Sequence, residues 1–234
     1  MRPSILVAFA CAGCSQHVYS PPAQAYSLGP LHALPPGSAA LDLEGSRSGQ
    51  VFDPKIDAAS ARVRAGIASG VEGSLEGAMY TVDDSGPSTA NRRIYVGRAG
   101  VRVGHPGIVW LAGLGGGFAP SGGPFVSADT GVAFGYDNCV VVPVVQVTGF
   151  VSVPLAPRPI DVSDDATTTF STPSTTFGGT IHTGLRFALS PSRCRAHRES
   201  PWITIGGGIT SMNDATTGAT FAGVGIGLEL PLGR

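Results

Sequence analysis

The stretch that decides the fold is VEGSLEGAMYTVDDSGPSTANRRIYVGRAGVRVG, residues 71–104. Up to Met79, the odd positions of its first half hold valine, glycine, leucine or methionine. The even positions of the same half include Glu72 and Glu76. A period of two is that of a β-strand, because successive side chains point to opposite faces. The first half is therefore expected to be a strand with one apolar face and one charged face.

The second half repeats the alternation after the turn-forming segment DDSGPSTAN, residues 83–91. Arg98 and Arg102 fall on its charged face. In an antiparallel hairpin about this segment, Glu76 lies opposite Arg98 and Glu72 lies opposite Arg102. Opposite charges across a ladder stabilise the sheet, and arginine can bind a carboxylate in bidentate geometry. The spacing predicts two ion pairs on one face of one hairpin.

The same alternation continues through most of the chain from residue 38. It predicts ten strands, at 39–51, 60–68, 71–82, 92–104, 107–118, 124–136, 139–153, 177–189, 201–211 and 217–231. Most are as long as the roughly 9–11 residues that a tilted strand needs to cross a bilayer. Their second face is crowded with glycine, which makes up 34 of the 234 residues, and this indicates a narrow interior.

The connections between these strands alternate in length. The odd-numbered connections are 52–59, 83–91, 119–123, 154–176 and 212–216. The even-numbered ones are Ser69-Gly70, His105-Pro106, Asp137-Asn138 and 190–200, of which only the last is long. Long loops at one end and tight periplasmic turns at the other are typical of transmembrane β-barrels.

In these strands and connections, residues 38–231 resemble bacterial outer-membrane β-barrel proteins. The resemblance implies an all-β fold, a closed antiparallel up-and-down transmembrane barrel of about ten strands, with eight or twelve as alternatives. It implies a place in the cell outer membrane, contact with outer-membrane lipid and help from the insertion machinery. A periplasm-facing or surface lipoprotein is the alternative location.

The charged face would line the interior of such a barrel. It carries acids and arginines in nearly equal number: Asp42, Glu44, Glu72, Glu76, Asp129 and Glu229 against Arg62, Arg64, Arg98, Arg102 and Arg186. Buried charges need partners, because an unpaired ion in a low-dielectric interior is costly. A ten-stranded barrel is only slightly wider than one that its own side chains fill. We therefore expect a lumen plugged by charge rather than an open pore.

The first residues, MRPSILVAFACAGC, are typical of a secretory signal, with a charged Arg2 and a short apolar run. Their end resembles the lipobox of bacterial lipoproteins, which implies cleavage before Cys14 and lipidation of Cys14. Cleavage after Ala25 is the alternative. The predicted organisation is a signal peptide at 1–13 (alternatively 1–25), a proline-rich linker at 14–37 and a barrel domain at 38–234.

Cys139 and Cys194 both remain in the mature chain after either cleavage. Cys139 begins the predicted seventh strand, and Cys194 lies in the connection that ends the eighth. Both fall at the periplasmic ends of neighbouring strands. Because the periplasm is oxidising, thiols that meet there pair. We predict a Cys139–Cys194 disulfide.

Composition and motifs argue against several function classes. The net charge of −1 offers no basic excess for binding nucleic acid. No G-x-S-x-G, H-E-x-x-H or phosphate-loop pattern occurs. His182, with Asp129 or Glu229 to orient it, is the best enzymatic arrangement, but a lone interior histidine is more often structural. We expect no enzyme, no cofactor and no metal site.

The predicted function is that of a small, closed outer-membrane barrel lipoprotein with a structural or surface-exposed role; its protein partner is unknown. The alternative is a lipid-tethered soluble β-sandwich that binds a glycan or a protein. The two differ in where apolar residues such as Leu75 and Met79 point: into a core in a sandwich, outward in a barrel.

Overall fold

The structure is a computed structural model. It describes residues 19–24, 28–50, 55–83, 92–120, 122–136, 138, 140–161, 170–189 and 200–232.

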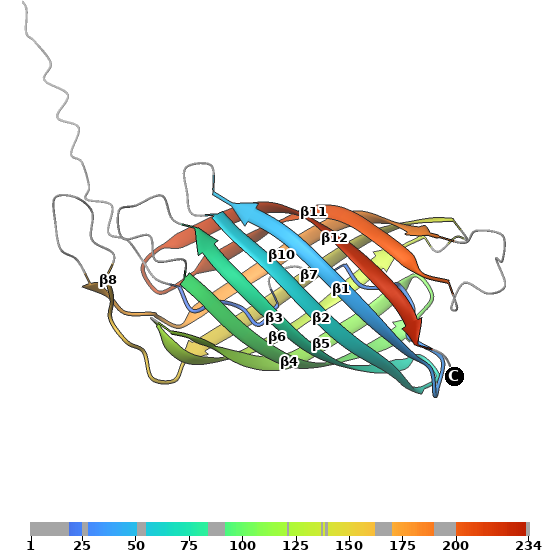
Figure 1. Ribbon diagram of the computed structural model, residues 1–234, viewed down its shortest axis with the longest axis horizontal. Coiled ribbons are helices and arrows are strands. Elements are labelled where there is room, and N and C mark those ends of the chain that lie inside the picture. Colours follow the sequence, from blue (N-terminus) through green and yellow to red (C-terminus); the bar gives the residue numbers. More distant parts are fainter. Residues whose placement is uncertain are drawn as a thin grey trace, which may run out of the picture.

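Ten long antiparallel strands close into a barrel (Figure 1). Consecutive long strands pair with each other, and β1 pairs with β12 to close the sheet. The long strands are β1 (Ala39–Gly49), β2 (Lys55–Ala68), β3 (Val71–Asp83), β4 (Arg92–His105), β5 (Ile108–Ala119), β6 (Gly123–Gly135), β7 (Val141–Pro154), β10 (Thr176–Ala188), β11 (Trp202–Asn213) and β12 (Gly218–Leu232). Between β7 and β10, β8 (Ile160–Asp161) and β9 (Phe170–Ser171) form a separate two-stranded sheet. The described residues include no helix able to span a membrane.

Closure of ten strands confirms the predicted fold class. The largest difference in bounds is at β2, which begins at Lys55 and not at residue 60. This alanine-rich start pairs with β1 on one side and β3 on the other, and pairing from both sides extends the strand. The pattern does not predict β8 and β9, because a two-residue strand has no measurable period.

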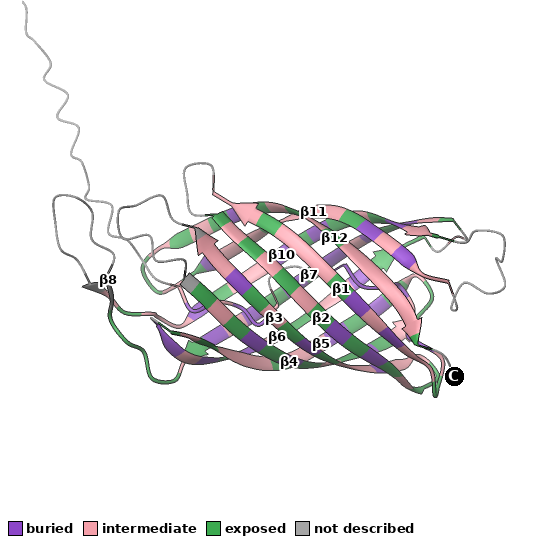
Figure 2. Cartoon of the chain, in the orientation of Figure 1, coloured by how far each residue is buried: buried purple, intermediate pink, exposed green. Residues whose placement is uncertain are grey.

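The two faces of the barrel wall differ as the alternation predicts (Figure 2). On the outside, Leu75 and Leu114 are 69% and 70% exposed. On the inside, Arg64 and Glu72 are fully buried. A single closed sheet with apolar residues outside has no second sheet to pack against, so the β-sandwich alternative is wrong.

The barrel has two distinct ends. The turn end carries connections 69–70 and 106–107, the start of β1 and the end of β12. The loop end carries connections 50–54, 84–91 and 155–175. In Figure 1 the turn end is on the right and the loop end is on the left.

Candidate functional site

The lumen of the barrel contains a part of the chain itself. Residues 19–24 and 28–36, here termed the lumen segment, run inside the strands and are drawn in dark blue in Figure 1. At the loop end, Tyr19 forms a β-bridge with Ser174. At the turn end, the N–H of Gly37 donates to the carbonyl of Gly66, shortly before β1 begins. The lumen segment therefore spans the barrel from one end to the other.

Polar contacts fix the lumen segment at the loop end. The backbone N–H of Ser20 donates to Thr176 Oγ1 at 2.9 Å, and Ser20 Oγ lies 2.8 Å from Ser152 Oγ. All three residues are buried. The hydroxyl of Tyr19 lies 2.6 Å from Thr217 Oγ1. Each such hydrogen bond contributes about 0.5–1.5 kcal/mol, and together they set one register against β7 and β10.

The loop between β11 and β12 orders the same mouth of the barrel. Asp214 Oδ1 accepts the backbone N–H groups of Thr216 and Thr217, and Asp214 Oδ2 accepts the hydroxyl of Ser174. Hydrogen bonds to the charged form, with that from Thr217 first, lower the pKa of Asp214. Thr217 and Ser174 both contact Tyr19, so Asp214 positions the residues that hold the start of the lumen segment.

Further along, the side chains of the lumen segment occupy space left by small residues in the wall. Ala23 packs in a buried cluster with Tyr80, whose hydroxyl donates to the Ala23 carbonyl at 3.3 Å. Leu28 lies against Gly184 and Gly206, where an added Cβ would overlap its Cδ1. The glycine-rich inner face thus makes room for a polypeptide.

Leu31 anchors the lumen segment near the turn end. Its side chain is fully buried, and its carbonyl accepts the N–H of Gly107 at 3.3 Å. The surrounding apolar cluster consists of Leu28, Leu111, Ala133, Val142, Val144 and Trp202. Burial of a leucine in such a cluster stabilises docking by about 1.5–3 kcal/mol.

Two predicted lumen charges bind the backbone of the lumen segment. Arg102 Nη2 donates to the carbonyl of Pro30 at 2.6 Å. Glu72 Oε2 accepts the N–H of Leu34 at 3.0 Å. The Arg102 guanidinium also fills the position where a Cβ on Gly29 would lie. Hydrogen bonds to charged groups contribute about 1.5–3 kcal/mol, so these two side chains are strong contacts of the segment.

Arg64 is the centre of a buried ion-pair network. Its three guanidinium nitrogens lie 2.8 Å from Asp42 Oδ2, 2.9 Å from Glu72 Oε2 and 2.9 Å from Glu229 Oε2. These contacts join β2 to β1, β3 and β12. Two further arginines extend the network: Arg62 to Asp42 and Glu44, and Arg186 to Glu229.

A second ion pair lies on another part of the wall. Arg98 of β4 reaches across β5 to Asp129 of β6 and binds it through two hydrogen bonds, Nε to Oδ2 at 2.7 Å and Nη2 to Oδ1. Gly113 of β5 lies between them, and a Cβ there would overlap the guanidinium. Gly113 therefore permits this bidentate pair.

Gly113→Ala is expected to displace the Arg98 guanidinium and to lower the free energy of unfolding by about 1–3 kcal/mol, the usual cost of overpacking. Urea unfolding of the purified protein in detergent measures this change. Gly77→Ala is the matched control, because an added Cβ at Gly77 meets nothing within 4 Å. Equal losses in both variants would contradict the role of Gly113.

The structure places the predicted hairpin charges in the expected register but gives them different partners. Glu72 is opposite Arg102, and Glu76 is opposite Arg98. In a closed barrel, inward side chains of non-adjacent strands converge, so a long arginine can reach beyond the residue directly opposite. The salt bridges of these residues are instead Glu72–Arg64, Arg98–Asp129 and Glu76–Arg62, the last at 3.8 Å.

The lumen segment is the part of the site that the sequence analysis missed. Its prolines predict an extended linker ahead of the barrel. Two features of the sequence could have predicted that this segment lies inside the barrel. The inner face is crowded with glycine, which leaves space beside the wall, and the proline-rich stretch presents Leu28, Leu31 and Leu34 three residues apart.

Of the remaining predicted sites, His182 lies within the described residues and the three cysteines do not. His182 is buried in the lumen, opposite Gln146 of β7. Its proposed partners, Asp129 and Glu229, bind arginines. No three His, Cys, Asp or Glu side chains of the described residues could together hold a metal ion. The three cysteines of the predicted lipidation and disulfide, Cys14, Cys139 and Cys194, lie outside the described residues.

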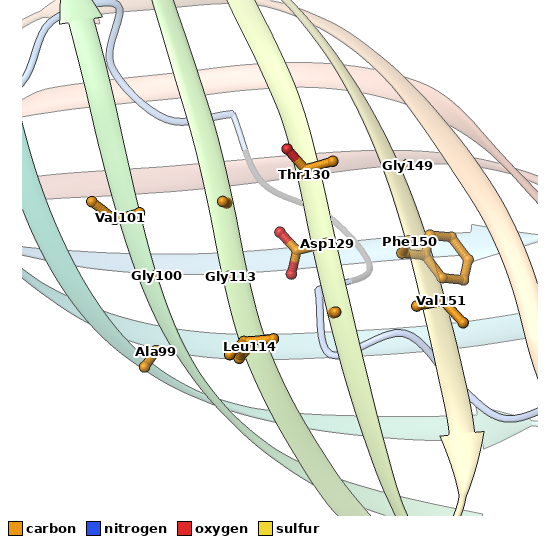
Figure 3. A pocket seen from close by; sticks show the side chains of 12 residues that line it. Ala99, Gly100, Val101, Gly113, Leu114, Asp129, Thr130, Gly149, Phe150 and Val151 are labelled. Atoms are coloured by element: carbon orange, nitrogen blue, oxygen red, sulfur yellow. The ribbon is translucent and has the colours of Figure 1, made fainter.

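The outer wall carries a hollow of about 680 Å³ over β4 to β7 (Figure 3). Adjacent strands present the small residues Ala99, Ala112, Ala128 and Gly149 there. Figure 3 shows the lumen segment passing behind these strands. The hollow is therefore a feature of the outer face, separate from the lumen.

Fold and lumen together define the class of this chain: a closed ten-stranded antiparallel barrel that contains its own N-terminal segment. No family model and no curated protein matches the sequence. Among solved structures, the chain is similar to Neisserial surface protein A (NspA), with 13% identity over 82% of this chain and 95% of that chain and a TM-score of 0.39. It is also similar to the N-terminal β-barrel domain of Pseudomonas aeruginosa OprF (12% identity, 83% and 98% covered, TM-score 0.35). The β domain of the Bordetella autotransporter BrkA is similar at 10% identity, with 84% and 100% covered and a TM-score of 0.45.

Proposed function

We propose that this chain is a small outer-membrane β-barrel with a structural or surface-exposed role, closed by its own N-terminal segment and not a diffusion pore. The observation that carries the proposal is the set of contacts from Tyr19 at the loop end to Leu34 at the turn end. The apolar outer wall suits hydrocarbon, and the charged inner wall is shielded from it. In this orientation the turn end faces the periplasm and the loop end faces outward.

The space within the wall supports closure. Small cavities on the inner face, beside Arg102, beside His182 and beside Glu76, have volumes of about 20, 20 and 10 Å³. A cavity of this size holds roughly one water molecule. A cavity of this size is too small to hold a water-filled channel.

The proposal also includes features that rest on sequence. The chain is anchored by lipid on Cys14, inserted by the machinery of the outer membrane and stapled by the Cys139–Cys194 disulfide. It has no enzymatic activity and needs no cofactor. The signal-like residues 1–14 and the oxidising periplasm support the first and third of these features.

Planar-bilayer recording of the full-length protein tests closure. The expected result is no stepwise conductance, because the lumen segment and the ion pairs block water and ions. A 16–18-stranded porin, which holds an aqueous channel, provides the positive control. Stable, discrete conductance steps from pure wild-type protein would contradict the proposal.

A further inference from the structure

We infer that the mature chain begins before Tyr19 and is threaded through its own barrel, so that its N-terminus emerges at the loop end, on the cell surface. The sidedness rests on the proposed function, whereas the threading rests on the contacts of the lumen segment alone.

The number of crossings gives the sidedness. Ten strands return the chain to the end at which it began, so the start of β1 and the end of β12 lie together at the turn end. The lumen segment adds one more crossing, from Tyr19 at the loop end to Gly37 at the turn end. An eleventh crossing puts Tyr19 on the face opposite the C-terminal end of β12.

The contacts of residues 19–24 discriminate between the two cleavage sites. Cleavage after Ala25 would remove Ser20, which binds the buried hydroxyls of Ser152 and Thr176. It would also remove the carbonyl of Ala23 that Tyr80 binds. Buried polar groups without a partner are costly. A barrel that begins at residue 26 therefore loses the hydrogen bonds that Ser20 and Ala23 make with its inner wall.

Cleavage before Cys14 keeps these contacts. It leaves residues 14–18 ahead of Tyr19, and five extended residues span at most about 18 Å. That length is enough for the mature N-terminus to clear the mouth of the barrel, and acylation of Cys14 leaves no free thiol there. Processing therefore occurs at Cys14, and the mature N-terminus lies on the outer side of the membrane.

Two measurements on the full chain, expressed with its own signal, test the inference. Intact mass and N-terminal peptide mapping of the mature protein locate the cleavage site. Gln16→Cys, made with Cys139 and Cys194 replaced by serine, is labelled on intact cells with a membrane-impermeant maleimide. The matched controls are Ala156→Cys at the loop end and Ser69→Cys in a turn at the opposite end, both at exposed positions.

The expected result is a mature chain that starts at Cys14, and labelling of Gln16→Cys and Ala156→Cys, but not of Ser69→Cys, on intact cells. A mature chain that starts at Tyr26, or a Gln16→Cys that labels only after permeabilisation together with Ser69→Cys, would overturn it. If instead both controls label alike, the barrel does not span the membrane, and the proposed function fails independently of threading.

Discussion

Replacement of Leu31 by aspartate is expected to release the turn-end half of the lumen segment and to give measurable channel conductance. Leu31 is fully buried among apolar side chains from the wall and from Leu28. Truncation of a buried leucine to alanine costs about 2–5 kcal/mol. A carboxylate at the same place adds the cost of burying an unpaired charge, so the loss exceeds that range. Planar-bilayer recording measures the conductance of the variant beside that of the wild-type protein, which is expected to show none.

A matched pair of milder variants separates lumen packing from a general loss of leucine. Leu31→Ala is expected to lower the free energy of unfolding by about 2–5 kcal/mol, because it opens a cavity. Leu114→Ala makes the same chemical change on the outer wall, where the side chain is 70% exposed. It is expected to lower the free energy of unfolding far less. If the Leu31 variants unfold with the same free energy as the wild type and show no channel conductance, the segment does not close the lumen.

Arg64→Met is expected to lower the free energy of unfolding by about 3–5 kcal/mol near pH 7, the cost of breaking a buried ion pair from one side. The variant leaves Asp42, Glu72 and Glu229 without the guanidinium that they share. Asp42 and Glu229 keep their salt bridges to Arg62 and Arg186, whereas Glu72 loses the guanidinium that neutralises it.

Urea unfolding at pH 7 measures the size of this loss. Arg47→Met is the matched control, because Arg47 is well exposed and lies 3.5 Å from an exposed Asp57. Exposed ion pairs contribute about 0–1 kcal/mol. A loss for Arg64→Met that equals the loss for Arg47→Met would contradict the central place of Arg64 in the network.

The sequence predicted the wall of the barrel because the wall follows local rules. A strand between lipid and lumen must alternate, and the parity of Glu72 and Leu75 records which face each side chain occupies. Register followed from the position of the turn segment at 83–91, which is why Glu72 and Arg102 lie opposite each other as expected. Neither inference needs knowledge of residues far away in the chain.

What lies inside the barrel depends on contacts between distant residues, and the sequence pattern does not encode those directly. Arg98 binds Asp129 across an intervening strand. This contact requires the curved sheet and the absence of a side chain at Gly113. The lumen segment lacks the period of two that marks a strand, because proline has no N–H to donate to a regular ladder. Its position comes from contacts such as that of Leu34 with Glu72.

The most direct test of the account is a disulfide between the lumen segment and the wall. Ser20 Oγ and Ser152 Oγ are 2.8 Å apart, so Ser20→Cys with Ser152→Cys, in the full chain with Cys139 and Cys194 replaced by serine, brings two sulfurs within bonding range. Ser20→Cys with Ser74→Cys is the control, because Ser74 lies on β3 near the turn end. Peptide mass spectrometry after mild oxidation in native membranes should find the Ser20–Ser152 crosslink in most molecules and the control crosslink in few. Absence of the first crosslink, or equal yields of both, would show that the N-terminal segment does not occupy the lumen.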